Sequence, residues 1–90
     1  MDFVNSQYRT VELLREDKYG CEYLAQDLYK DHMIKRMRII DYIPETKAFI
    51  EYMKVNFYDY KNLIHPNIPK FYYFNRIRDI NGKYVVSNKF

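Results

Sequence analysis

Three segments of the first 40 residues carry strand patterns: the first has apolar residues among polar ones, and the other two show the two-residue period that is typical of half-buried strands. The segments are residues 8–15, 21–26 and 32–40. A charged stretch and Gly20 separate the first two, and glycine permits a tight turn, so we expect a hairpin there. The third segment, rich in isoleucine and methionine, predicts a further strand.

The pattern then changes to the three- and four-residue spacing of a helix that packs one side onto a sheet. Pro44 suits the first turn of such a helix, because the N–H that proline lacks would be unpaired there. The apolar positions that recur at this spacing are Phe49, Tyr52, Met53, Phe57, Tyr60 and Leu63 or Ile64. Asn56 lies within this stripe. The prolines of the segment 65–69 end the helix, so we predict one main helix at about 44–63.

The last twenty residues return to a strand pattern. Residues 70–80 are aromatic and prone to form a strand, and Asn81-Gly82 is a strong hairpin-turn signal before a returning strand that begins at Lys83. The whole chain, 1–90, therefore reads as one α+β domain, with an antiparallel sheet of four to five strands and one helix.

Bulk composition restricts the function classes. Ninety residues allow one small core, and 11 tyrosines with 6 phenylalanines supply much of it. The single cysteine, Cys21, cannot form an internal disulfide, and we interpret it as a packed, inert residue in a reducing compartment. No apolar run approaches the ~20 residues of a membrane span, so we expect a cytoplasmic protein without a membrane partner. His32 and His65 lack supporting carboxylates and are interpreted as structural, and no metal site is expected.

The charge distribution gives little support to a nucleic-acid partner. The formal net charge is +3, from 15 basic and 12 acidic residues. Lys35, Arg36 and Arg38 form a basic cluster that could contact phosphates, but acidic residues on neighbouring segments offset its field. Glu22 is expected to pair with Arg38 across two strands. Candidates for a protein-interaction surface are the tyrosines Tyr58, Tyr60, Tyr72, Tyr73 and Tyr84.

Element order and three motifs resemble the small lobe of protein kinases. Residues 14–25 (LREDKYGCEYLA) match the pattern LGxGxxGxVYxA, residues 37–40 (MRII) match A-I-K-x-I, and residues 65–68 read HPNI. The opening VNSQYRTVELL and the helix FIEYMKVNF are also similar to the truncated kinase-like segment that begins some large bacterial signalling proteins. Those proteins continue into ATPase, helical-repeat and diguanylate cyclase (GGDEF) regions, so the resemblance implies a fragment of a longer protein.

The departures from the kinase pattern remove its phosphate-binding loop. The first two loop glycines correspond to Arg15 and Asp17, which leaves only Gly20. A carboxylate at Asp17 would repel phosphate. The valine that covers adenine corresponds to Glu22, whose desolvation against a planar base costs several kcal/mol.

The ion pair of the kinase pattern is also missing. Its lysine corresponds to Arg38 by the MRII motif, although counting from Gly20 falls nearer Met37, and Lys35 is the nearest lysine. The helix glutamate corresponds to Asn56, which could hydrogen-bond Arg38 without catalysis. The chain also lacks the catalytic lobe, so the resemblance implies a pseudokinase-like module with no catalytic residue and no cofactor.

The resemblance leads to a non-catalytic regulatory or docking module, whose partners are other domains of its parent or a signalling protein. One alternative is a sensor of a nucleotide or phosphorylated ligand, bound through Gly20, Lys35, Arg36 or Arg38. Nucleic-acid binding is a second alternative. The bacterial likeness leaves open whether the fifth strand lies within 83–88 or beyond the chain. An uncapped sheet edge would favour a homodimer or strand exchange.

Overall fold

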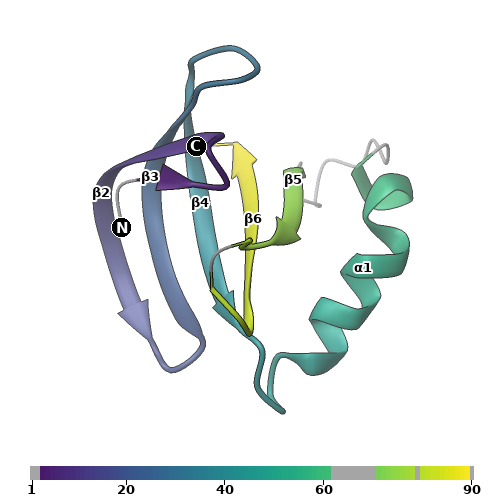
Figure 1. Cartoon of the computed structure of the whole chain (residues 1–90). Helices are drawn as coiled ribbons and strands as arrows, with labels where there is room; N and C mark the ends of the chain where they lie inside the picture. The colour runs from purple at the N-terminus through teal and green to yellow at the C-terminus, as the bar shows by residue number, and fades with distance from the viewer. Residues whose placement is uncertain (1–2, 62–70, 79, 90) are drawn as a thin grey trace.

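Six antiparallel strands and one helix make up the part of the chain that the computed structural model describes, residues 3–61, 71–78 and 80–89 (Figure 1). The sheet order is β1-β2-β3-β4-β6-β5. The elements in chain order are β1 (Phe3–Val4), β2 (Tyr8–Asp17), β3 (Gly20–Asp27), β4 (Ile34–Asp41), α1 (Lys47–Lys61), β5 (Phe71–Arg76) and β6 (Lys83–Lys89).

The predicted strands are confirmed, and the sheet gains one strand that was not expected. β6 lies within the chain, so the question of the last strand is answered, and Asn81-Gly82 forms the predicted turn before it. The additional strand is β1, which pairs with β2 over only two residues, after a turn at Asn5 and Ser6 with positive φ. Two residues are too few to produce a readable period.

The β2–β3 hairpin turn is held by Asp17 and Gly20. The Oδ1 atom of Asp17 accepts the N–H groups of Tyr19 (2.9 Å) and Gly20 (3.2 Å). Gly20 has a φ of 146°, and a Cβ there would lie 1.8 Å from the Ile39 carbonyl oxygen. The glycine is therefore required by the close approach of β4, a structural demand that exists without any phosphate ligand.

Helix α1 begins at Lys47, three residues later than predicted. Pro44 lies in a turn, and Thr46 is the N-cap, since its carbonyl accepts the Ile50 N–H at 3.0 Å. The Thr46 hydroxyl donates to the Asp41 carbonyl and accepts the Ile43 N–H at 3.1 Å, which fixes the connection from β4. The predicted end near 63 and the HPNIP segment lie outside the described residues.

Each face of the sheet carries its own apolar core, because successive strand residues point to opposite sides. One core lies inside the curl of the sheet, where β1 and β2 bend towards β6. It contains Val4, Tyr8, Ala25, Met37, Ile39, Ile77 and Val85. The Asn5 side chain closes this curl by accepting the Arg78 N–H and donating to the Arg76 carbonyl, both at 2.9 Å. The other core lies under α1 and contains Ile40, Ile50, Met53 and Val86.

The buried face of α1 differs from the predicted stripe. Ile50 and Met53 are buried, whereas Phe49 and Tyr52 are 42% and 53% exposed. Apolar residues cover more of the helix circumference than its contact with β5 and β6 can bury. Periodicity therefore predicted the helix and its packed residues Met53 and Phe57 correctly, but it included the exposed Phe49 and Tyr52 and missed Ile50.

Candidate functional site

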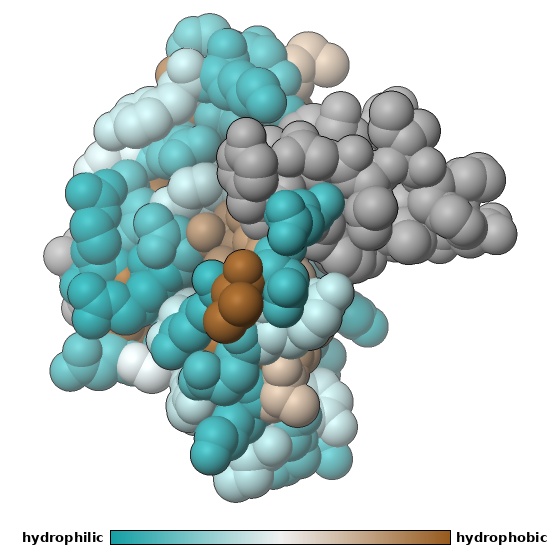
Figure 2. All heavy atoms as spheres, turned by 90° about the vertical axis from the view of Figure 1, so that its right-hand side faces the viewer, coloured by the Kyte–Doolittle hydropathy of each residue, from teal (hydrophilic) through white to brown (hydrophobic). Residues whose placement is uncertain are grey.

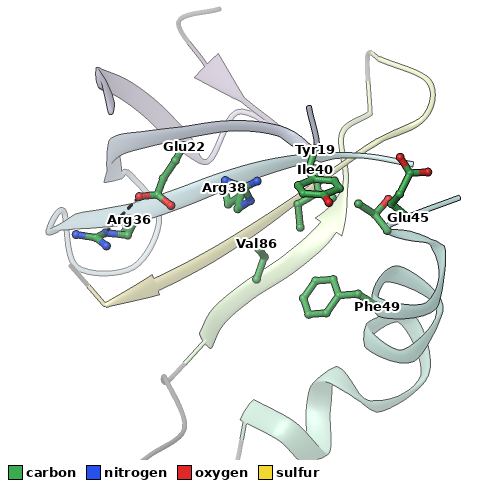
Figure 3. A pocket seen from close by; sticks show the side chains of 9 residues that line it. Tyr19, Glu22, Arg36, Arg38, Ile40, Glu45, Phe49 and Val86 are labelled. Carbon is green, nitrogen blue, oxygen red and sulfur yellow. Dashed lines mark ion pairs between the residues drawn. The ribbon is translucent and has the colours of Figure 1, made fainter. Parts of the chain in front are cut away.

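A cavity of about 330 Å³ lies between the sheet and the beginning of α1 (Figure 3). It is lined by Tyr19, Glu22, Arg36, Arg38, Ile40, Glu45, Thr46, Phe49 and Val86. Figure 3 shows the Glu22 and Arg36 pair at one end and Glu45 at the other, with Arg38 between them. The site therefore combines the apolar side chains of Ile40, Phe49 and Val86 with charged groups of both signs.

Strand register places these residues on one face. Glu22 of β3 lies opposite Arg38 of β4, which in turn lies opposite Val86 of β6. Arg36, Arg38 and Ile40 alternate along β4 and so point to the same side. Phe49 reaches towards this face from the first turn of α1 (Figure 3).

Arg38 forms the central ion pair of the site with Asp17. Its Nη2 donates to both Asp17 carboxylate oxygens, at 2.9 and 3.0 Å, and its side chain is 21% exposed. The Tyr19 N–H, and then the Arg38 guanidinium, lower the pKa of Asp17. The Nη1 atom of Arg38 is buried and has no hydrogen-bond partner among the described residues.

Glu22 is held between two arginines and does not form the predicted ion pair with Arg38. Its carboxylate lies 3.7 Å from Arg15 Nε and 3.8 Å from Arg36 Nε, and only 13% of its side chain is exposed. The predicted register of Glu22 and Arg38 is correct. The ion pair differs from the predicted one because the β2–β3 turn places the Asp17 carboxylate against the Arg38 guanidinium.

The basic cluster expected from the sequence is divided between the two faces. Arg36 and Arg38 line the cavity, whereas Lys35 is buried on the other side with its Nζ 3.0 Å from Asp31 Oδ2. Met37 belongs to the core of that other face. Of the three positions considered for the kinase lysine, only Arg38 therefore reaches the cavity.

Asn56 does not take part in the described site. Its Nδ2 donates to the Tyr52 carbonyl at 3.1 Å, while Arg38 is bound to Asp17, so the expected contact between Asn56 and Arg38 is replaced by these two bonds. The part of α1 that reaches the cavity is its beginning, at Thr46 and Phe49. The sequence did not indicate Phe49 as a site residue, because its spacing also fits a core position.

The candidate tyrosines that can be described are half-buried. Tyr73 packs against Tyr8, with ring centroids 5.5 Å apart, and Tyr84 stacks on Phe74 at 5.7 Å and an interplanar angle of 11°. The side chains of Tyr58, Tyr60 and Tyr72 lie outside the described residues. Both described tyrosines serve the packing of the two cores.

Cys21 and His32, which could in principle act as a nucleophile or a metal ligand, have structural surroundings. Cys21 is half-buried, its Sγ lies 3.6 Å from Glu16 Oε2, and burial raises its pKa. His32 belongs to the turn before β4 and has a φ of 56°, whereas His65 lies outside the described residues. Within the described part of the chain, no cluster of His, Cys, Asp and Glu side chains could hold a metal ion.

The arrangement of the curled antiparallel sheet and α1 is that of a protein-kinase small lobe. Two crystal structures of mutant forms of the Mycobacterium tuberculosis PknI kinase domain are each similar to this chain, with a TM-score of 0.75 and 16% sequence identity. The match covers 99% of this chain but 35% of each kinase domain. The chain thus spans about a third of those domains, and the likeness shows the fold.

No protein-family model and no curated protein matches the sequence. In the part of the chain that the structure describes, none of the helices has the length and apolar character needed to cross a membrane.

Proposed function

We propose that this chain is a non-catalytic regulatory module, which docks a protein partner inside a larger cytoplasmic signalling protein. The observation that carries the proposal is the contact between Asp17 and Arg38. It combines two substitutions of the kinase pattern, at a loop glycine and at the strand lysine, into one internal ion pair.

This ion pair opposes phosphate binding. A kinase offers the N–H groups of its glycine-rich loop and a third-strand lysine to the phosphates. Here the Asp17 carboxylate uses the N–H groups of Tyr19 and Gly20 and also neutralises Arg38. A phosphate would have to displace a carboxylate that occupies the same donors, and the two anions repel one another.

The same cavity is also unsuited to adenine. Glu22 stands where the kinase pattern has a valine against the base, and it is nearly buried between Arg15 and Arg36. A planar apolar ring placed there would strip this network of its remaining water, which is costly for charged groups. A protein side chain with mixed polarity suits the walls better than a nucleobase does.

The role of the parent protein follows from the sequence resemblance alone. We expect a diguanylate cyclase or helical-repeat signalling protein, in which this module tunes an output made by another domain. The small-lobe fold supports this proposal because it retains α1 and the cavity beside the beginning of that helix.

Amide NMR of the 90-residue chain tests the proposal. The chain would be titrated with magnesium-ATP, a cyclic diguanylate and tripolyphosphate, while residues 15–20 and Arg38 are followed. We expect no saturable shifts up to about 1 mM ligand, which corresponds to less than about 4 kcal/mol of binding. Saturable shifts confined to these residues would overturn the docking role.

One observation favours a second candidate function, a sensor of a small phosphorylated ligand. Arg38 Nη1 is buried beside the cavity without a partner in the described structure, and such a donor is costly unless a ligand or water satisfies it. In the same titration, this function predicts tripolyphosphate shifts centred on the Arg38 guanidinium. It also predicts that Arg38→Gln abolishes them.

A further inference from the structure

The solvent-exposed face of α1 carries a second helix-packing pattern, which its contact with the sheet does not use. Ala48, Tyr52, Val55 and Asp59 recur at spacings of four, three and four residues, opposite the buried Ile50 and Met53. These spacings form the ridge by which one helix packs against another. All four residues are exposed, with Tyr52 at 53% and Val55 at 80%. Figure 2 views the molecule from the α1 side and shows apolar atoms at the surface within a largely hydrophilic face.

Two exposed charges stand at the ends of the helix where its dipole does not favour them. Lys47 is the first helical residue, and no acidic residue occupies the first turn, while Asp59 lies near the end. The helix dipole favours anions at the beginning of a helix and cations at the end. In an antiparallel pair, Lys47 lies beside the C-terminal end of the neighbouring helix and Asp59 lies beside its N-terminal end. The dipole of the neighbouring helix therefore favours both charges.

We propose that this face binds a second copy of the chain, with the two α1 helices packed antiparallel about a two-fold axis. Tyr52 of one copy then lies against Val55 of the other, and Lys47 lies near Asp59 of the other copy. The pattern is self-complementary, as a symmetric interface requires. Parallel packing would place like charges together. The proposal rests on the docking function, for which it names the partner.

The helix is anchored in a way that keeps this face available. Glu51 Oε1 accepts the Tyr42 hydroxyl at 2.6 Å and lies 3.5 Å from Lys54 Nζ. The same ammonium lies 5.6 and 5.2 Å from the ring centroids of Tyr42 and Tyr84. These contacts direct Glu51 and Lys54 towards the sheet and hold α1 in place. A rigid helix loses less freedom on association.

The size of the face sets the expected strength of the dimer. Fifteen residues make a helix about 22 Å long, and a single helix pair of that length falls at the small end of specific interfaces. We therefore expect a reversible dimer with a dissociation constant on the order of 10 μM to 1 mM. The concentration series must extend through this range.

Sedimentation equilibrium of the 90-residue chain measures the association, and two matched variants locate it. Val55→Glu places a charge in the centre of the proposed interface and should weaken the dimer at least about tenfold. Leu13→Glu is the control, because Leu13 is 50% exposed on β2, away from α1. It should leave the dissociation constant unchanged. Amide NMR spectra of both variants verify that the fold is retained.

A charge-exchange cycle then tests the antiparallel arrangement. Lys47→Glu and Asp59→Lys should each weaken the dimer, and the double variant should recover most of the loss, since the opposite charges face each other again. A monomer at every concentration would overturn the proposal. So would a dimer that survives Val55→Glu or that only Leu13→Glu disrupts, because its interface would lie elsewhere.

These results are independent of the nucleotide titration. If the chain is a monomer and binds no nucleotide, only the second copy is rejected as the partner, and the docking role stands. A dimer through α1 that also binds nucleotide overturns the docking role proposed above and leaves the interface intact.

Discussion

Arg38 and Asp17 form a two-oxygen contact in which one guanidinium nitrogen donates to both carboxylate oxygens, at 2.9 and 3.0 Å. The two residues are 21 positions apart, and the β2–β3 turn brings them together. Because Asp17 also accepts two N–H groups of that turn, one side chain both shapes the hairpin and neutralises Arg38.

Removal of the Asp17 carboxylate should expose a latent anion site. We expect Asp17→Ala to bind tripolyphosphate at least about tenfold more tightly than the unchanged chain, because Arg38 loses its competing anion. Isothermal titration calorimetry should give a measurable dissociation constant for Asp17→Ala and no saturable heat for the unchanged chain below about 1 mM ligand. Glu16→Ala is the control, since it removes a neighbouring carboxylate that does not contact Arg38. Equal gains in the two variants would show that Asp17 has no special role.

The two glycines should differ sharply in their tolerance of a methyl group. Gly20→Ala directs a Cβ into the Ile39 carbonyl and should destabilise the fold by about 3 kcal/mol or more. Gly82→Ala meets open space and carries only the strain of its φ of 74°, about 1 kcal/mol. Urea unfolding measures both. Similar losses would contradict the structural reason given for Gly20.

The buried face of α1 can be tested with two neighbouring residues. Ile50→Ala opens a cavity between α1 and β6 and should cost about 2–4 kcal/mol of unfolding free energy. Phe49→Ala truncates a side chain that is 42% exposed and should cost less than about 1 kcal/mol. Thermal or urea unfolding distinguishes them. A larger loss of unfolding free energy for Phe49→Ala than for Ile50→Ala would contradict the buried face described above.

Tyr8 should make stability sensitive to alkali. Its hydroxyl shares a 2.7 Å hydrogen bond with Ser87 inside the core, and burial raises its pKa far above the ordinary value of 10.0. The unfolded chain therefore releases this proton first, so stability present below pH 10 is lost as pH rises above it. Urea unfolding from pH 8 to 11 should show a shallower decline for Tyr8→Phe.

The matched control for that series is Tyr29→Phe, because Tyr29 is 67% exposed. Its alkaline decline should follow that of the unchanged chain. At neutral pH, Tyr8→Phe should cost about 1–2 kcal/mol, since Ser87 loses its buried partner. If the unfolding free energy of Tyr8→Phe declined with pH as steeply as that of the unchanged chain, the role assigned to the buried hydroxyl would be contradicted.

Stability should also fall on acidification. The N–H groups and basic side chains around Asp17 and Asp31 lower both pKa values below the ordinary 3.8. Such groups stabilise the fold above the unfolded pKa, and that contribution is lost as pH falls through the folded pKa. Urea unfolding between pH 6 and 2.5 should therefore decline mainly below about pH 4. Asp17→Asn should show a smaller decline.

The sequence predicted the strands and the small-lobe order because both depend on local periodicity and turn residues. Glu22 and Arg38 were also placed opposite each other correctly, since strand register follows the hairpin. Local patterns found Met53 and Phe57 on the buried side of α1 but missed Ile50, and they could not show that Asp17, instead of Glu22, would pair with Arg38. Both outcomes depend on the curl of the sheet, which tertiary packing determines.

The central claim is that the cavity arginine, Arg38, is paired with Asp17 and does not serve a nucleotide. The most direct measurement follows the Arg38 Nε–H signal of the 90-residue chain by NMR while magnesium-ATP is added. We expect an unchanged signal up to about 1 mM ATP. A saturable shift of that signal, together with loss of the contact to Asp17, would contradict it.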